Sequence, residues 1–87
     1  MDIYQIEWRK SALRELKRLD RHIVSRIVST VESLATVPLP SGVPKLRGSQ
    51  RTFRLRLGDY RVIYELWECR LVVQIVRVRH RKDVYRK

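Results

Sequence analysis

Hydrophobic and polar residues alternate with a period of two at the start of the chain. In the segment 2–8, DIYQIEW, the bulky side chains of Tyr4, Ile6 and Trp8 fall on one side of an extended backbone, and the residues between them fall on the other. Because successive side chains of a strand point to opposite faces, this pattern predicts a first β-strand.

The period changes to that of a helix from Ser11 onward. Leu13, Leu16 and Leu19 recur at helical spacing, and Ser11 is a residue type that commonly caps a helix. Asp20 can cap a second helix, whose apolar stripe is wide enough to face a sheet. That stripe consists of Ile23, Ile27, Val31 and Leu34, widened by Val24 and Val28. We therefore expect an antiparallel helical hairpin over residues 11–35.

A loop and three further strands are expected after the hairpin. The segment VPLPSGVP, 37–44, contains three prolines and a glycine and cannot continue a helix. Strand-like runs then follow at 52–57, 60–67 and 71–79, separated by the turn Gly58–Asp59 and by residues 68–70. The tail HRKDVYRK is expected to hold the end of the last strand and then a turn or short helix.

This order of elements predicts a two-layer α+β fold. An N-terminal strand and the helical hairpin are expected to pack on a mostly antiparallel four-stranded sheet with a short C-terminal tail. Because 87 residues suffice for one domain and leave no room for a second, residues 1–87 are expected to form a single domain.

Arginine alternates with apolar residues in the stretch RTFRLRLGDYRVIY, 51–64. A single helical layer covers only one face of the sheet, so Phe53, Leu55 and Leu57 are expected to face it. The arginines between them then project from the uncovered face. The residues expected there are Arg54, Arg56 and Arg61, together with Arg77 or Arg79 if the strand registers agree.

Positive charge is concentrated in the second half of the chain. The formal net charge is +11: residues 1–44 hold seven Lys or Arg against five acids, a net of +2, and residues 45–87 hold thirteen against four, a net of +9. Arginine matches phosphate with a planar fork of donors. We therefore expect a polyanionic partner, and nucleic acid first, although an acidic protein would also explain the charge.

Composition excludes several other classes of protein. No apolar run approaches the roughly 18 residues of a membrane span, and no signal-peptide pattern is recognised. The single cysteine, Cys69, excludes an internal disulfide, and two histidines form no recognisable metal-ligand cluster. The three glycines lie too far apart for a phosphate-binding loop. A cytoplasmic protein without membrane contact, and without a metal or other cofactor, is expected.

The basic residues of the second half suit the cleavage of RNA without a metal. The group consists of Arg54, Arg56, Arg61, the cluster Arg79–His80–Arg81–Lys82, and Tyr85. Cations around a phosphate stabilise the charge that builds up when the adjacent 2′-hydroxyl attacks it. A tyrosine ring can stack on a base. A sheet that binds phosphates without cleaving RNA would have the same residues, so chemistry alone leaves both readings open.

Three segments together resemble the RelE toxins of the RelE/ParE superfamily: KLRG at 45–48, FRLRLGDYRVIY at 53–64 and VRHRKDVY at 78–85. The resemblance spans nearly the whole chain and implies a single RelE-like toxin domain over residues 1–87. It implies the toxin of a type II toxin–antitoxin system, which enters the A site of the 70S ribosome and cleaves mRNA there. It also implies an antitoxin from the same operon, through which alone the toxin would reach operator DNA.

The resemblance assigns roles to individual residues. Arg61 matches the family arginine that stabilises the transition-state phosphate. Arg81 matches the arginine after the last strand, which is assigned to charge stabilisation or to protonating the leaving oxygen. Tyr85 matches the C-terminal tyrosine that orients the substrate or stacks on it. Arg54 and Arg56 stand where the family pattern has two lysines. Because arginine keeps its proton, they are expected to position and neutralise rather than to act as a base.

The general base is therefore left open. His80, Glu65, Tyr85 and ribosomal RNA are the alternatives, and Glu65 is instead expected to pair with an arginine on the open face. Further RNA contacts are expected from Lys45, Arg47, Arg51, Arg77, Arg79 and Lys82. Two other functions stay open as well: a ParE-like inhibitor of DNA gyrase that is not a nuclease, and a plain RNA-binding module.

Overall fold

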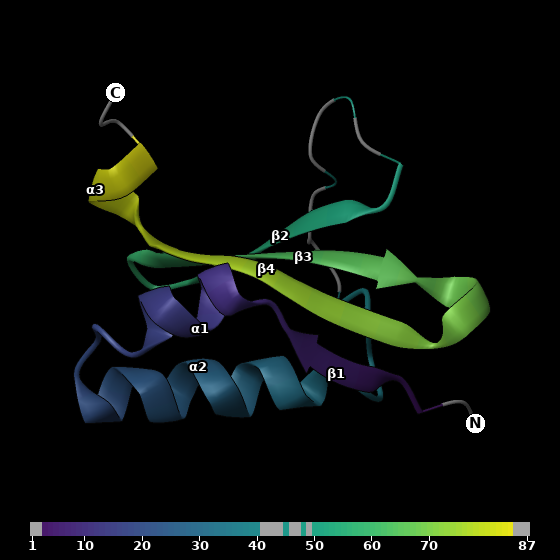
Figure 1. Cartoon of the computed structure of the whole chain (residues 1–87), viewed down its shortest axis with the longest axis horizontal. Helices are drawn as coiled ribbons and strands as arrows, with labels where there is room; N and C mark the ends of the chain where they lie inside the picture. The colour runs from purple at the N-terminus through teal and green to yellow at the C-terminus, as the bar shows by residue number, and fades with distance from the viewer. Residues whose placement is uncertain (1–2, 41–44, 46–47, 49, 85–87) are drawn as a thin grey trace.

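The computed structural model describes residues 3–40, 45, 48 and 50–84 of the chain (Figure 1). Its elements follow the expected order of strand, helical pair and meander. They are β1 (Gln5–Trp8), α1 (Lys10–Leu16), α2 (Arg21–Ser33), β2 (Thr52–Leu57), β3 (Tyr60–Trp67), the 3₁₀ turn η1 (Glu68–Arg70), β4 (Val72–His80) and α3 (Arg81–Val84). Of the two alternatives expected for the tail, a turn or a short helix, the structure shows the helix.

The four strands form one sheet in the order β1-β4-β3-β2. β2 pairs antiparallel with β3 and β3 antiparallel with β4, whereas β1 runs parallel to β4. The sheet is thus mostly antiparallel, as expected. The parallel pairing arises because the two helices carry the chain back across the sheet before β2 begins.

The helices α1 and α2 and the core lie on one side of the sheet, and α3 rises from the other side (Figure 1). Tyr64, Val62 and Ile75 from the strands and Ile27 and Val31 from α2 are fully buried. Phe53 and Leu57 pack against this core and Leu55 is buried in it, so their predicted orientation is confirmed. The tail helix is therefore the described helix that lies on the side of the arginines.

One residue is inserted into β4 at Val76, and it changes the direction of every side chain beyond it. Ile63 pairs with Arg77 whereas the next residue of β3, Tyr64, pairs with Ile75, so Val76 has no counterpart. Before this bulge Ile75 points to the helices, and after it Val78 does. Both Arg77 and Arg79 consequently face away from the helices.

Two details were predicted wrongly, the cap of the first helix and the start of the first strand. Ser11 does not cap α1: the residue before the helix is Arg9, and the hydroxyl of Ser11 donates to the carbonyl of Val76 at 2.7 Å. The first strand begins at Gln5 rather than at residue 2, since the N–H of Tyr4 donates to Ala35 instead of to a strand. Asp20 does precede α2, but its side chain makes no capping hydrogen bond. In the described part of the chain, no helix is long and apolar enough to cross a membrane.

Candidate functional site

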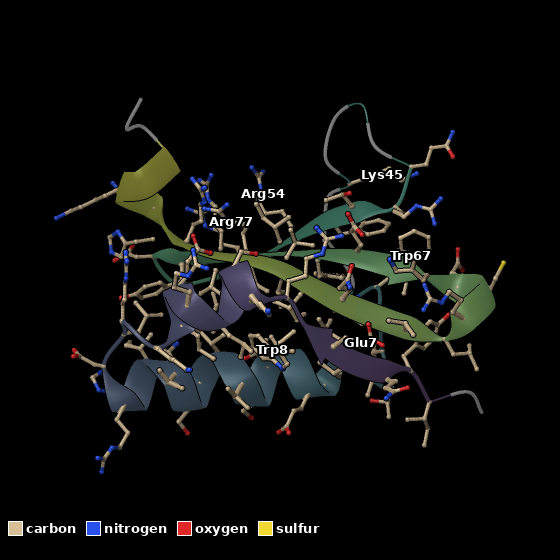
Figure 2. All side chains as sticks on the ribbon, in the orientation of Figure 1. Glu7, Trp8, Lys45, Arg54, Trp67 and Arg77 are labelled. Atoms are coloured by element: carbon tan, nitrogen blue, oxygen red, sulfur yellow. The ribbon has the colours of Figure 1, made fainter. Side chains whose placement is uncertain are left out.

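Five arginines lie in two rows on the sheet face that α1 and α2 leave uncovered. The strand registers place Arg56, Arg61 and Arg79 directly opposite one another across β2, β3 and β4. Two residues further along each strand, Arg54, Ile63 and Arg77 form a second row. Side chains directly opposite on neighbouring strands are about 5 Å apart at Cβ, so the five guanidinium groups share one small area. Figure 2 shows Arg54 and Arg77 on the side of the sheet away from α2.

The charges in these arginine rows are only partly neutralised. Like charges directly opposite on neighbouring strands destabilise a sheet, and Arg56–Arg61 and Arg61–Arg79 are two such pairs. Among the described residues, no ion pair involves Arg54, Arg56 or Arg61. A cluster of cations that the fold itself does not neutralise is suited to bind an anion.

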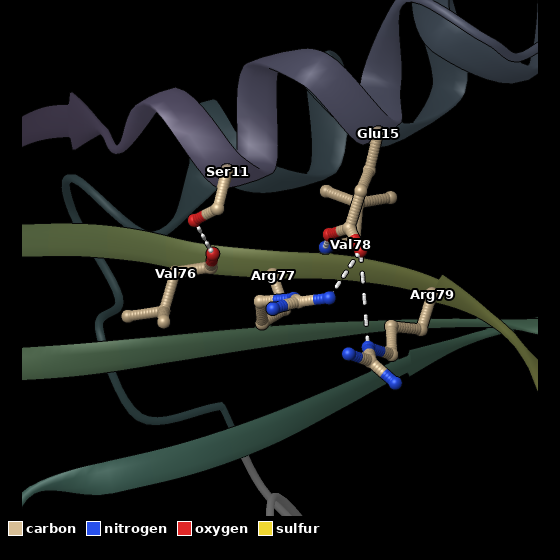
Figure 3. A network of polar contacts seen from close by, with 6 residues as sticks. All are labelled: Ser11, Glu15, Val76, Arg77, Val78 and Arg79. Carbon is tan, nitrogen blue, oxygen red and sulfur yellow. Dashed lines mark hydrogen bonds and ion pairs between the residues drawn. The ribbon is translucent and has the colours of Figure 1, made fainter. Parts of the chain in front are cut away.

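The remaining two arginines of the rows are held by Glu15 of α1 (Figure 3). Its carboxylate accepts a hydrogen bond from Nη2 of Arg77 at 2.8 Å and lies 3.8 Å from Nε of Arg79. It also accepts the backbone N–H of Val78 at 2.8 Å. β1 ends at Trp8, so beyond Ile75 the edge of β4 is covered by α1, and Glu15 takes the place of a partner strand. The Nε atom of Arg77 is buried and has no hydrogen-bond partner among the described residues.

Glu15 is the residue of this area that sequence reasoning missed. The sequence places it near the start of a helix, but helical periodicity does not say beside which strand edge the helix lies. One sequence signal could have pointed to Glu15. The buried stripe of the first helix consists of Ala12 and Leu16, so Glu15 lies at the edge of that stripe, next to the residues that contact the sheet.

Arg81 lies at the same end of the sheet as the row of Arg56, Arg61 and Arg79. Its backbone N–H donates to the carbonyl of Asp59 at 2.6 Å, and its Nη1 is 3.8 Å from the Asp59 carboxylate. Asp59 belongs to the turn between β2 and β3, which directly follows that row. Both side chains are more than 60% exposed, so this ion pair contributes little stability and leaves the guanidinium accessible. Tyr85 lies outside the described residues.

The structure does not bring His80 onto the face of the arginines. His80 pairs with Tyr60 on the helix side of the sheet, where the two rings meet edge to face with centroids 5.0 Å apart. Its Nδ1 accepts the backbone N–H of Lys82 at 3.1 Å. Because the side chains of a strand alternate, His80 and its neighbour Arg79 leave the backbone on opposite sides.

Glu65 lies on the open face but is engaged elsewhere. Its carboxylate pairs with Arg9 at 3.3 Å, and the same arginine donates from Nε to Gln74 at 3.1 Å. Glu65 thus pairs with an arginine, as predicted, but the partner is Arg9, which follows β1, and not one of the arginines expected on the open face. Within the ranges that the structure describes, no group of three His, Cys, Asp or Glu side chains is arranged to hold a metal ion.

The other residues expected to contact RNA are spread over the molecule. Arg51 lies at the far end of the open face, with its guanidinium 4.0 Å from the ring centroid of Trp67. Lys45 is exposed and its backbone forms an isolated antiparallel β-bridge with Phe53, and Lys82 is exposed on α3. Arg47 lies outside the described residues. Of this set, only Arg77 and Arg79 belong to the arginine rows.

Comparison with known proteins agrees with this geometry. Residues 6–85 match the family model described as the ParE toxin of the type II toxin–antitoxin system parDE. The toxin RelG of Mycobacterium tuberculosis is 34% identical over 85 residues, which cover 97% of this chain and 98% of that protein. The toxin RelE3 of Methanocaldococcus jannaschii is 30% identical over 80 residues, 87% of this chain and 89% of that protein.

Solved structures show the same fold. The chain superposes with a TM-score of 0.81 on the toxin–antitoxin complex RelBE2 of Mycobacterium tuberculosis, at 32% identity over 92% of this chain and 93% of that chain. The RelE–RelB complex of Pyrococcus horikoshii OT3 gives the same TM-score at 30% identity, over 91% of this chain and 96% of that one. From a family match over nearly its whole length, and from relatives at this level of identity, the chain belongs to the RelE/ParE family of toxins from type II toxin–antitoxin systems.

Proposed function

We propose that this chain is a ribosome-dependent endoribonuclease that cleaves mRNA in the A site and so stops translation. The observation that carries the proposal is the pair of arginine rows on the open face, in which Arg54, Arg56 and Arg61 have no ion-pair partner among the described residues. A fold that tolerates opposed like charges in its sheet gains from them when an anion binds.

The reaction that such a surface favours is attack within the RNA chain. The 2′-oxygen bonds to the adjacent phosphorus, the bond from phosphorus to the 5′-oxygen breaks, and the products are a cyclic phosphate and a 5′-hydroxyl. Negative charge accumulates on the phosphoryl oxygens as the new bond forms. Guanidinium groups fixed in a sheet are already oriented toward that charge, so they stabilise the transition state more than the ground state.

We assign Arg61 to the transition-state phosphate because it is the middle residue of its row and has an arginine on either side. Arg54 and Arg56 position and neutralise the neighbouring backbone. Arg81, which is exposed beside the β2–β3 turn, stabilises the charge on the departing oxygen. Tyr85 is assigned to orienting the substrate on the basis of the family resemblance alone.

The proton of the 2′-hydroxyl must go to a base. Glu15 is the described carboxylate beside the rows, but it is bonded to Arg77 and to the backbone N–H of Val78. His80 lies on the opposite side of the sheet, and Glu65 is paired with Arg9. We therefore assign this step to Tyr85 or to a group of the ribosome. In the second case, the toxin supplies the cations and the ribosome supplies the base and the in-line geometry, which explains why cleavage would need the ribosome.

An antitoxin partner is part of the same proposal. The solved relatives include RelE–RelB complexes from Pyrococcus horikoshii and Methanococcus jannaschii, and similar chains are expected to have similar partners. An acidic segment of a cognate antitoxin, encoded in the same operon, would neutralise part of the +11 charge and exclude RNA. The ribosomal target also implies that the toxin acts in the cytoplasm.

The decisive experiment adds the purified chain to ribosomes programmed with a defined mRNA and maps new 5′ ends. We expect cuts at the A-site codon when ribosomes are present and far fewer on the free message. The variant Arg61→Ala should leave the message intact, whereas Arg21→Ala, which removes an exposed arginine of α2, should cut like the unchanged chain. If mRNA stayed intact when the unchanged chain was added, the proposed nuclease activity would be refuted.

Two observations favour a second function, the inhibition of DNA gyrase. The matching family model is described by ParE rather than by RelE, and Glu15, the described carboxylate next to the arginine rows, is already bonded to Arg77 and to the N–H of Val78. A gyrase supercoiling assay separates the two functions: inhibition of supercoiling without any new mRNA ends would assign the chain to the ParE type.

A further inference from the structure

A groove runs between α1 and the part of the β4 edge that β1 does not pair with, on the flank of the arginine rows. Two adjoining hollows, of about 370 and 200 Å³, share Glu15, Arg18 and Arg77 in their walls. The larger one also reaches Arg79 and His80, and the smaller one reaches Ser11 and Arg14. We call the two hollows together the edge groove.

The edge groove is strongly cationic. Four guanidinium groups, from Arg14, Arg18, Arg77 and Arg79, line it together with the single carboxylate of Glu15. That carboxylate is already bonded to Arg77 and lies near Arg79. Within the described part of the chain, Arg14 and Arg18 take part in no ion pair, and both are exposed.

The edge groove begins where the arginine rows end. Arg79 is the last residue of the row that contains Arg61, and it also forms part of the groove wall. From there the cations continue to Arg14 of α1 and to Arg18, which lies in the turn just after α1 ends, and both line the smaller hollow. A third hollow of about 460 Å³ extends this basic surface along α1, through Lys10 and Lys17. The cations therefore form one continuous track from β2 over β4 to α1.

We propose that the edge groove binds phosphates of RNA and guides the strand away from the cleavage site across the edge of β4. This inference rests on the proposed function only for the position of the scissile phosphate. An acidic peptide would be the competing occupant, but peptide docking relies on buried apolar anchors. The apolar lining of the edge groove is limited to Val78, which is only 4% exposed, and Leu19, which is half-buried, against four guanidinium groups. Backbone phosphates require only the guanidinium forks.

The test compares two double variants in binding rather than in cleavage. Arg14→Gln/Arg18→Gln removes the α1 side of the groove, and Arg21→Gln/Arg26→Gln removes two exposed arginines of α2 as a matched control. Binding of a 2′-O-methyl oligonucleotide, which cannot be cleaved by its own 2′-oxygen, is measured over a series of salt concentrations. A second arm uses vacant ribosomes, so that message and ribosomal RNA are distinguished.

We expect the slope of log K against log salt concentration to become shallower by about 1.4 for the α1 variant, which is two phosphate contacts at about 0.7 each on a single strand. The α2 variant should keep the slope of the unchanged chain. Arg14→Lys/Arg18→Lys, which retains both charges, should also keep it, and this guards against a mere loss of folding. A change seen with vacant ribosomes alone would support the groove and assign it to ribosomal RNA.

Equal slopes for the two glutamine variants on both RNAs would overturn the inference. It would also be overturned if the α1 variant lost affinity for an oligoglutamate peptide while its RNA slope stayed unchanged, since the groove would then belong to an acidic protein. Because cleavage is not measured, the edge groove can be confirmed even if the chain proves not to be a nuclease.

Discussion

On the helix side of β3, Val62, Tyr64 and Leu66 are between 0% and 5% exposed and form the centre of the core. On the other side of the same strand, Arg61 stands between two further arginines and Glu65 pairs with Arg9. Both sets belong to one backbone and alternate residue by residue. The two faces thus share one backbone geometry but differ in what stabilises them. Apolar burial stabilises the helix side, whereas on the open side carboxylates neutralise only some of the arginines.

The comparison teaches that the open face does not hold the fold together. Apolar burial contributes about 25 cal/mol per Å² and comes from the helix face, whereas opposed arginines cost stability. Substitutions on the two faces should therefore separate stability from activity. The following predictions test that separation, beginning with the largest expected effect.

Ile75→Ala should lower the free energy of unfolding by about 2–5 kcal/mol, because it leaves a cavity in a fully buried part of the core. The matched change on the open face is Ile63→Ala, which lies between Arg54 and Arg77 and is only half-buried. It should cost much less. Urea unfolding followed by circular dichroism measures both, and equal losses would show that the open face supports the fold after all.

Arg61→Ala should lower mRNA cleavage by about 10²–10³-fold, the usual cost of removing one donor to a transition-state anion. Its free energy of unfolding should not fall, because the substitution removes two opposed like-charge pairs. The rate is measured on programmed ribosomes and the stability by urea unfolding. A variant that loses activity and stability together would place Arg61 among the structural residues.

Tyr64→Phe should change how stability depends on alkaline pH. Burial raises the pKa of the Tyr64 phenol from 10.0 to about 12. Between these values the unfolded chain has released this proton and the folded chain still holds it. The free energy of unfolding therefore falls by about 1.4 kcal/mol per pH unit in this window, a loss that is absent below pH 10. Without the phenol, the decline should be shallower.

The same substitution also removes the hydrogen bond that Tyr64 donates to the carbonyl of Pro38 at 2.7 Å. At neutral pH this loss should cost about 1 kcal/mol. Urea unfolding at neutral pH and between pH 10 and 12 gives both quantities. Parallel stability curves for the two chains across the alkaline window would contradict the assignment of the shift to Tyr64.

Glu65→Gln should have the smallest effect. Its ion pair with Arg9 is partly exposed and is worth at most about 1 kcal/mol. If the base lies elsewhere, as proposed, the cleavage rate should stay close to that of the unchanged chain. A collapse of the rate with an intact fold would instead identify Glu65 as the base and would extend the catalytic area beyond the arginine rows.

The sequence was a good guide to the two faces because period-two alternation is a local property. The strands 52–57 and 60–67 were predicted at their observed limits, and the run FRLRL orients its side chains as expected. The association of Arg56 with Arg61 follows from the tight turn Gly58–Asp59, which fixes the register of its two strands.

What the sequence did not show was how distant elements meet. The pairing of β1 with β4 and the position of Glu15 beside Arg77 join residues about sixty positions apart, and no local pattern encodes such contacts. His80 was grouped with the arginines because it is their neighbour along the chain. Adjacent residues in a strand point to opposite faces, so sequence proximity was the wrong guide at that position.

The bulge at Val76 shifts, by one residue, the alternation of core-facing and open-face side chains in β4. In residues 72–75 the odd-numbered side chains point toward the helices, and from residue 77 onward the even-numbered ones do. Deleting Val76 would restore a regular alternation and leave Arg77 and Arg79 on the open face, opposite Ile63 and Arg61. If Val76 stayed and the strand were regular, both arginines would instead turn into the core, which could not solvate them. A homologue whose final strand lacks the extra residue therefore keeps one plain alternation of polar and apolar positions, and an alignment without a gap at Val76 would pair its core residues with cationic ones.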